Sequence, residues 1–508
     1  MLYKRRDFIK ISGITAAGSL IVPSLLQSCK GTALSGGVSK YLEHFEVTPE
    51  LLKKVILTAM SKGGDYADLY FEHTINNYSN LEDGKVNQAS SNIAYGVGIR
   101  VLKGDQTGYA FTEIITPEAM LKAAGTAASI ANDTGKSITE NITEFTSPNL
   151  YPVVTTWEDT SIREKIPFLE RLNEKIFALD NKVTKVNASI GDTTSYIMFY
   201  NSEGLLACDY RPLVYISGTS VMEKDGRTEN ASVSRSARKG AEFLTNELVD
   251  NMAQDVVAKT NLQFLAGKPK AGEMEVVMSA GESGILLHEA IGHAFEADFN
   301  RKKTSIFSDK LNKKVAEDFI TIVDDGTLPS DRGSLNFDDE GNATENTVIV
   351  RNGILSSYLH DRISAAYYNV KPTGNGRRQS FRFMPVPRMR STRMENGPHK
   401  KEEIIASVRN GVYVDNFSNG QVNIGAGDFT FFVKAGYLIE NGKLTMPIKD
   451  INIIGNGPQA LADIVMAGDD AKLADGTWTC GKAGQSVPVT LGLPTVKVRK
   501  LVVGGVNA

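Results

Sequence analysis

Residues 286 to 295 read Leu-Leu-His-Glu-Ala-Ile-Gly-His-Ala-Phe, and this stretch holds two of the six histidines in the 508-residue chain. His288 and His293 lie five residues apart, and Glu289 directly follows the first histidine. Two neutral imidazoles can ligate a metal ion, and a carboxylate beside them can accept a proton from water. The stretch therefore predicts a helix that carries a hydrolytic zinc site.

The spacing of the two histidines predicts a distorted helix. On a helix of 3.6 residues per turn, positions i and i+4 are about 40° apart, whereas i and i+5 are about 140° apart. One ion cannot bridge the wider angle, so we expect a widened turn such as a π-bulge. Gly292 is the expected place for it, because glycine tolerates unusual backbone angles. The alternative is a buried amphipathic helix whose histidines are hydrogen-bonded core residues.

A third ligand is expected from the Gly-rich segment 475–485, which contains Cys480, one of three cysteines. A thiolate suits zinc, and Lys482 nearby would help to keep it deprotonated. Two histidines and one cysteine leave a fourth position open for water, as catalytic zinc requires. The alternative third ligands are Glu296, Asp298, His360 and His399.

The motif 288–293, taken with Thr479-Cys480-Gly481-Lys482, resembles the TldD/PmbA family of metallopeptidases. Further matching segments are 95–101, 324–329, 332–334, 338–341, 352–355, 374–378, 387–389 and 453–458. They follow one another over about residues 45 to 500, nearly the whole chain. One branch of the family carries His-Glu-x-x-x-His and is catalytic, and the other lacks it and acts as a partner. This chain resembles the catalytic, TldD-like branch.

The resemblance implies that His288, His293 and Cys480 bind Zn²⁺ and that Glu289 is the general base. It also implies hydrolysis of unfolded or short peptides, and a homodimer or a heterodimer with a PmbA-like partner. Two other functions stay open: a zinc-stabilised module that binds peptides without cutting them, and a zinc amidase acting on cell-wall peptides.

Other polar segments are weaker candidates. Arg377, in the Gly-rich loop 374–378, could orient a peptide substrate, and His360 could help to polarise its carbonyl group. The acidic run 338–340 lacks the ligand spacing of a calcium loop, so we expect a solvated turn there. The chain carries 56 basic and 59 acidic residues, and this near balance gives no strong positive electrostatic field that would attract nucleic acid.

The first 29 residues have the pattern of an export signal. Lys4-Arg5-Arg6 reads as a twin-arginine motif, and the apolar stretch 11–26 is short for a membrane span of about 20 residues. Residues 25–29 resemble a lipobox, which predicts a lipid anchor to the membrane at Cys29; the alternative is simple cleavage of the signal without lipidation. We also expect a flexible tether over 30–42 and a periplasmic or cell-envelope location. In an oxidising compartment Cys208 could pair with Cys480, but we expect Cys208 to be free in a strand.

The fold class expected is α+β. Residues 43–245 read as an N-terminal α+β domain with meandering strands, 246–268 as a connecting helix, and 269–508 as a mostly antiparallel β domain carrying the metal-binding helix. Thr-Pro-Glu at 48–50 and again at 116–118 begins a helix, the second running to Ala131, and a third helix spans 161–179. Expected strands and turns are 67–75, 94–102, 195–200, 205–210, 213–222 and 273–278, with turns at 83–84, 352–353 and 441–442, and a short helix over 401–409.

Overall fold

The computed structural model of the protein describes residues 37–138, 141–423 and 425–505. The predicted export signal, with Cys29, and residues 30–36 of the predicted tether lie outside these ranges. Within them, no helix is both long enough and apolar enough to cross a membrane.

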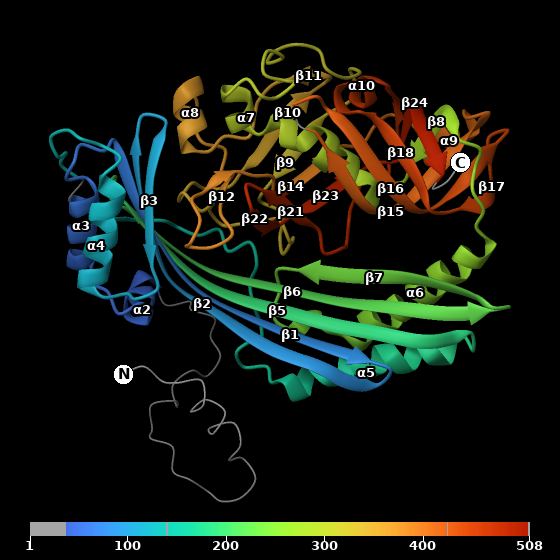
Figure 1. Cartoon of the computed structure of the whole chain (residues 1–508), viewed down its shortest axis with the longest axis horizontal. Helices are drawn as coiled ribbons and strands as arrows, with labels where there is room; N and C mark the ends of the chain where they lie inside the picture. The colour runs from blue at the N-terminus through green and yellow to red at the C-terminus, as the bar shows by residue number, and fades with distance from the viewer. Residues whose placement is uncertain (1–36, 139–140, 424, 506–508) are drawn as a thin grey trace, which may run out of the picture.

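The chain is α+β, as predicted, and has two layers: a long curved sheet lies beneath a β-rich second half (Figure 1). The first half contains α2 (Gly37–His44), α3 (Pro49–Ala59), β1 (Tyr66–Glu82), β2 (Lys85–Lys103), β3 (Gln106–Thr112), α4 (Pro117–Ala128), β4 (Thr143–Glu144), α5 (Ile162–Leu179), β5 (Val183–Asn201), β6 (Leu205–Lys224), β7 (Arg227–Ala237), the 3-10 turn η1 (Ala241–Phe243) and α6 (Asn246–Leu265). The strands β3-β2-β1-β5-β6-β7 pair antiparallel in that order, and the short strand β4 pairs with β6 in parallel.

The helices begin where their capping signals predict. The hydroxyl groups of Thr48, Thr116 and Thr245 each accept a hydrogen bond from a backbone N–H three residues on. The second helix ends at Ala128, three residues before the predicted end. The third predicted helix is α5, and the connecting helix is α6.

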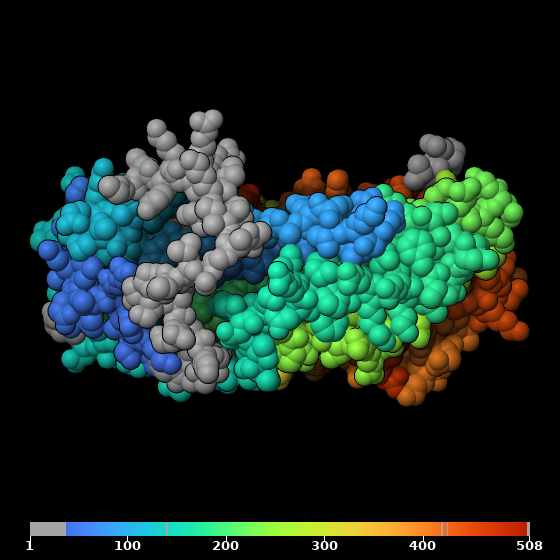
Figure 2. Space-filling model, turned by 90° about the horizontal axis from the view of Figure 1, so that it is seen from below, coloured from blue at the N-terminus to red at the C-terminus, as the bar shows by residue number. Residues whose placement is uncertain are grey.

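The long strands contribute side chains to two separate hydrophobic cores. One end of the sheet packs against α2, α3 and α4, and the other end packs against α5 and α6. Seen from below, residues of the first half of the chain, in blue to green, make up most of the visible face, with orange residues of the second half at the lower right (Figure 2). The predicted break between strands 205–210 and 213–222 was wrong, because β6 continues through Pro212. Pairing with β7 begins only at Val214, so Pro212 lies at a locally free edge where a missing N–H costs little.

The predicted tether is shorter than expected, because residues 37–42 belong to α2. Tyr41 is 4% exposed and packs its ring edge-on against Tyr196, with 6.3 Å between ring centroids. An aromatic side chain buried on one face holds this segment to the sheet.

The second half is the predicted mostly antiparallel β domain. It contains β8 (Gly272–Met278), η2 (Glu282–Gly284), η3 (Leu286–Gly292), η4 (His293–Phe295), α7 (Ala297–Arg301), β9 (Ile322–Asp325), β10 (Asn346–Arg351), β11 (Ile354–Leu355), α8 (Arg362–Tyr368), β12 (Gly376–Arg377), β13 (Val386–Pro387), β14 (Ser391–Met394), α9 (Lys401–Ala406), β15 (Asn410–Val422), β16 (Asp428–Glu440), β17 (Lys443–Ile448), β18 (Ile451–Asn456), α10 (Gly457–Ala462), β19 (Ile464–Ala467), β20 (Lys472–Leu473), β21 (Thr479–Lys482), β22 (Gln485–Pro488), β23 (Thr490–Leu493) and β24 (Val496–Gly505). The predicted turns at 352–353 and 441–442 join β10 to β11 and β16 to β17, and the short helix α9 ends at Ala406. Both larger sheets contribute to one core, and the segment 285–297 packs within it.

The acidic run 338–340 is not the solvated turn that its sequence suggested. Asp338, Asp339 and Glu340 are each 3% exposed or less. Asp339 pairs with Arg211 at 2.6 Å and Glu340 with Arg100 at 2.5 Å, so both carboxylates bind arginines of the long sheet. Buried carboxylates need charged partners, and here the partners come from more than a hundred residues away.

Candidate metal centre

The widened turn that the histidine spacing predicts is present. Residues 286–292 form a π-helical turn, η3, flanked by the 3-10 turns η2 and η4. The backbone N–H of His293 donates to the carbonyl oxygen of His288, five residues earlier, which is the π-type hydrogen bond. The two imidazole rings consequently lie 5.1 Å apart between centroids, at 79° to each other.

Gly292 permits this turn for a different reason from the one expected. Its φ and ψ are −60° and −48°, which any residue adopts, so the turn does not need glycine's conformational freedom there. A side chain would collide instead: a Cβ atom on Gly292 would lie 2.2 Å from Met389 Sδ and 2.8 Å from the carbonyl oxygen of Leu287. The glycine is required for close packing.

Replacing Gly292 with alanine is expected to lower the free energy of unfolding by about 1–3 kcal/mol, since the added methyl group overpacks the turn. Urea unfolding of the metal-free protein measures the change. Gly125→Ala is the matched control, because Gly125 lies in α4 with open space at its Cβ position and alanine favours helix. Equal midpoints for the two variants would contradict the packing role of Gly292.

The hairpin β21–β22 brings Cys480 to the two histidines. Ligand atoms of His288, His293 and Cys480 all lie within 4.8 Å of one another, and Cys480 Sγ is 3.5 Å from His293 Nε2. All three side chains are 3% exposed or less. Glu296, Asp298, His360 and His399, the alternative third ligands, are not part of this cluster.

The three side chains fit a zinc ion. Bonds of about 2.3 Å to sulfur and about 2.0–2.1 Å to nitrogen in a tetrahedral site hold those two atoms roughly 3.5 Å apart. The observed separation of Cys480 Sγ and His293 Nε2 matches this value. Neither ring nitrogen of the buried His288 has a hydrogen-bond partner in the described residues. A bound cation would satisfy one of these nitrogens.

The carboxylate of Glu296 orients His293. Its Oε2 atom is 3.0 Å from His293 Nδ1, so Nδ1–H donates to the carboxylate and Nε2 faces Cys480. The pair is buried, and Lys482 Nζ lies 3.0 Å from the same oxygen. Burial would raise the pKa of Glu296, but Lys482 and His293 lower it to about 2. The sequence predicts Glu296 only as an alternative metal ligand, although its position three residues after His293 also fits this orienting role.

The Cys480 thiolate is stabilised by the imidazoles and not, as predicted, by Lys482. Burial raises the pKa of the thiol, but the neighbouring His288 and His293 outweigh it and hold the pKa well below its usual value. Lys482 is turned instead to Glu296 and to Asp298, whose Oδ1 is 2.7 Å away. Arg388, which the sequence did not single out, donates to the carbonyl oxygen of Cys480 and supports the hairpin.

Glu289 is the one residue of η3 that is not fully buried. A carboxylate that is partly exposed beside two buried imidazoles can exchange protons with water next to a metal ion. Cys208 and Cys480 are both free thiols, so the disulfide alternative does not hold in this structure.

The two weaker candidates lie elsewhere. His360 is 4% exposed and packs between the rings of Tyr358 and Tyr368, whose centroids are 6.2 and 5.4 Å away. Arg377 is 2% exposed and donates to the carbonyl oxygens of Met389 and Pro488. Neither belongs to the cluster of ligand atoms.

Burial lowers the pKa of His360 from 6.5 to about 4, which predicts an acid-sensitive fold. Between these values the unfolded chain binds a proton that the native state excludes, so stability is complete above pH 6.5 and falls as the pH drops toward 4. The full loss from this group is about 3 kcal/mol. In His360→Asn, the free energy of unfolding measured with urea is expected to change less between pH 7 and pH 5 than in wild type. The same pH dependence in both proteins would contradict the lowered pKa of His360.

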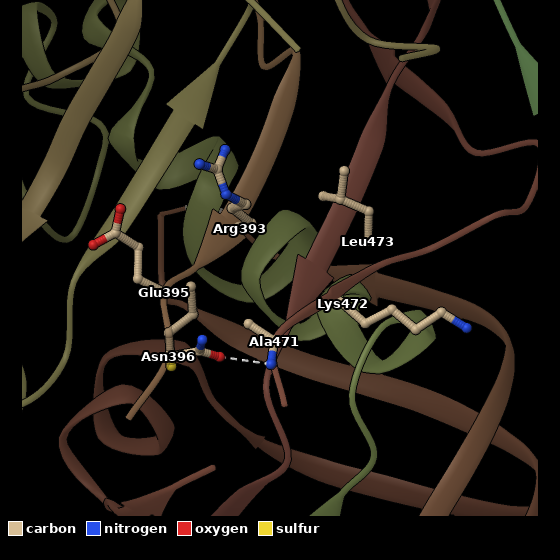
Figure 3. Close-up of a pocket in the computed structure, with 7 residues that line it drawn as sticks. Arg393, Glu395, Asn396, Ala471, Lys472 and Leu473 are labelled. Carbon is tan, nitrogen blue, oxygen red and sulfur yellow. Dashed lines mark hydrogen bonds between the residues drawn. The ribbon is translucent and has the colours of Figure 1, made fainter. Parts of the chain in front are cut away.

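A hollow of about 470 Å³ lies between the ends of β14 and β20 (Figure 3). Its lining includes Arg393, Glu395 and Lys472, and Asn396 Oδ1 accepts a hydrogen bond from the backbone N–H of Ala471 at 2.7 Å. None of the three clustered side chains lines it, so this hollow is separate from the candidate metal centre.

A buried set of two imidazoles and one thiol can hold a metal ion, and a partly exposed carboxylate beside it suits hydrolytic chemistry. Three family models match the chain: PmbA/TldA metallopeptidase domain 1 over residues 67–131, the central domain over 155–264 and the C-terminal domain over 271–505. The chain belongs to this PmbA/TldD metallopeptidase family and is a peptidase.

Individual relatives agree with the assignment of the chain to this family. It is 38% identical to the metalloprotease TldD homolog of Buchnera aphidicola over 87% of this chain and 93% of that protein. It is 30% identical to the zinc metalloprotease TldD homolog of Saccharolobus solfataricus over 89% of this chain and 99% of that protein.

Solved structures share the fold. A putative modulator of a DNA gyrase from Thermotoga maritima superposes with a TM-score of 0.72 at 24% identity, covering 90% of this chain and 99% of that one. TldE from Thermococcus kodakarensis gives a TM-score of 0.70 at 19% identity over 90% of this chain and all of that one.

Proposed function

We propose that this protein is a zinc-dependent peptidase that hydrolyses unfolded or short peptides, with His288, His293 and Cys480 as the zinc ligands and Glu289 as the general base. The observation that carries the proposal is the convergence of the three ligand atoms within 4.8 Å inside the core. Zinc is the metal named for the Saccharolobus relative, and two imidazoles with one thiolate suit it.

Zinc held there would supply a Lewis acid that polarises a peptide carbonyl group and makes water acidic near neutral pH. Glu289 accepts the proton of the attacking water and then delivers it to the leaving amine. Glu296 holds His293 with Nε2 toward the metal position, and Lys482 holds Glu296 in turn.

Metal analysis combined with peptide hydrolysis tests the proposal. The purified protein is expected to contain one zinc per chain and to cleave an unstructured fluorogenic peptide, to lose both on chelation, and to regain both on addition of zinc. Zinc-bound protein that binds peptides without cutting them would instead indicate a binding module. Cleavage of peptidoglycan fragments but not of plain peptides would indicate a cell-wall amidase.

We also propose that the protein works as a dimer, either with itself or with a PmbA-like partner, as the family resemblance implies. Light scattering of the purified protein is expected to give about twice the mass of one chain. A single-chain mass that persists when a PmbA-like protein from the same cell is added would refute the proposal.

Export is proposed from the sequence alone: the twin-arginine motif directs the folded protein across the membrane, and a lipid at Cys29 anchors it in the cell envelope. Replacing Arg5 and Arg6 with lysine is expected to leave the protein in the cytoplasm. Cys29→Ser is expected to release it from the membrane fraction without blocking export. An unchanged distribution in both variants would refute the proposal.

A further inference from the structure

A cavity of about 420 Å³ lies between the long sheet and the second half of the chain. Tyr70 of β1 and Ser195 of β5 line it from one side, and Arg377 of β12 and Pro488 of β22 line it from the other. Its volume is in the range of cavities that hold small ligands or parts of larger ones.

Arginines dominate its wall. Five of them line it, against two carboxylates: Arg211, Arg238, Arg377, Arg378 and Arg382, with Glu72 and Asp339. Three of the five have carboxylate partners: Arg211 pairs with Asp209 and Asp339, Arg378 lies 3.7 Å from Asp68, and Arg382 pairs with Glu113.

Arg238 and Arg377 have no carboxylate partner among the residues described. Arg238 is 4% exposed; it donates only weakly, at 3.3 Å, to the carbonyl oxygen of Pro212, and its Nε–H has no acceptor. Arg377 donates to two carbonyl oxygens, which leave its charge uncompensated. The Nε–H of buried Arg378 also has no acceptor. A buried charge without a counterion is costly, so the wall favours an anion.

The two carboxylates of the wall do not meet this need. Glu72 Oε1 accepts from the hydroxyl group of Thr74, and Glu72 Oε2 accepts from the backbone N–H of Phe381. Asp339 is held by Arg211 and by the backbone N–H of Arg378. The Nε–H groups of Arg238 and Arg378 are therefore not satisfied by these carboxylates.

The cavity adjoins the metal centre. Pro488 and Ser486, which line it, belong to β22, and β22 pairs with β21, the strand that carries Cys480. Arg377 donates to the carbonyl oxygen of Met389, whose Sδ atom packs against Gly292 of the π-helical turn.

We infer that this cavity binds a carboxylate group of the peptide substrate through Arg238, Arg377 and Arg378, and so gives the peptidase a preference for acidic substrates. The inference rests on the proposed function for its role in hydrolysis, but not for the binding itself. The carboxylate belongs either to the C-terminus of the peptide or to an Asp or Glu side chain, because both present the same two oxygens to a guanidinium group.

Binding is tested first without hydrolysis. Calorimetric titration of the zinc-loaded protein with succinate is expected to show saturable binding, and the neutral succinamide is expected not to bind. Arg238→Gln is expected to weaken succinate binding at least about tenfold, since a charge-assisted donor is lost. Arg235→Gln is the matched control, because Arg235 lies in β7, three residues before Arg238, but pairs with Asp255 and does not line the cavity. Succinate binding that is equal in both variants, or no binding at all, overturns the inference.

Hydrolysis then identifies the source of the carboxylate. Four versions of one peptide are compared, which combine a free or an amidated C-terminus with Glu or Gln at one internal position. Wild type is expected to prefer one acidic form at least about tenfold in kcat/KM, and Arg238→Gln to reduce that preference to near unity. Equal rates on all four peptides overturn the inference while leaving the peptidase assignment intact. Absence of any cleavage refutes the proposed function, and the succinate titration still decides the carboxylate site.

Discussion

Glu289→Gln is expected to reduce peptide turnover by about 10²- to 10⁴-fold while zinc remains bound. The amide has nearly the shape of the carboxylate but cannot accept the proton of an attacking water. Glu289 is the partly exposed residue of a turn whose other side chains are buried, so the change is expected to leave the core packing of His288 and His293 intact.

The measurement is kcat with an unstructured peptide, beside the zinc content of the same preparation. Glu317→Gln serves as the control, because the Glu317 side chain is 43% exposed and distant in sequence from every proposed ligand. It is expected to match wild type in both quantities. Full activity of zinc-loaded Glu289→Gln would remove Glu289 from the mechanism.

Features fixed by a few neighbouring residues could be predicted from the sequence. The Thr-Pro-Glu starts of α3 and α4 are local capping signals, and the turn at Asp83-Gly84 follows from residues that tolerate positive φ. The π-helical turn was also predictable, because five-residue spacing of two ligands is incompatible with a regular helix.

Features that depend on distant partners could not be predicted in this way. The acidic run 338–340 looked solvated because its arginine partners lie in β2 and β6. Lys482 is two residues from Cys480, which predicted that it would stabilise the thiolate. It pairs instead with the carboxylates of Glu296, just before α7, and of Asp298 in α7. The requirement for glycine at 292 arises from Met389, which lies almost a hundred residues further along the chain.

Cys480→Ser is expected to abolish stoichiometric zinc binding and, with it, peptide hydrolysis. A serine hydroxyl group stays protonated near neutral pH and is a poor zinc ligand, whereas the thiolate is the ligand that the ion prefers. We expect zinc affinity to fall by more than about 100-fold, beyond the loss that removal of an outer hydrogen-bond partner causes. Competition with a chromogenic chelator measures the affinity, and metal analysis measures the stoichiometry.

Cys208→Ser is the matched control for the thiol. Cys208 lies in β6, is not part of the cluster of ligand atoms, packs against a different core from Cys480 and is likewise a free thiol. It is expected to keep one zinc per chain and wild-type turnover. Because Cys480 is one member of a large core, its serine variant is expected to remain folded, so that loss of metal is separable from loss of structure by circular dichroism. A folded Cys480→Ser protein with a full complement of tightly bound zinc would show that the third ligand is another side chain, and the convergence of the π-helical turn with the β21–β22 hairpin would then be a packing contact alone.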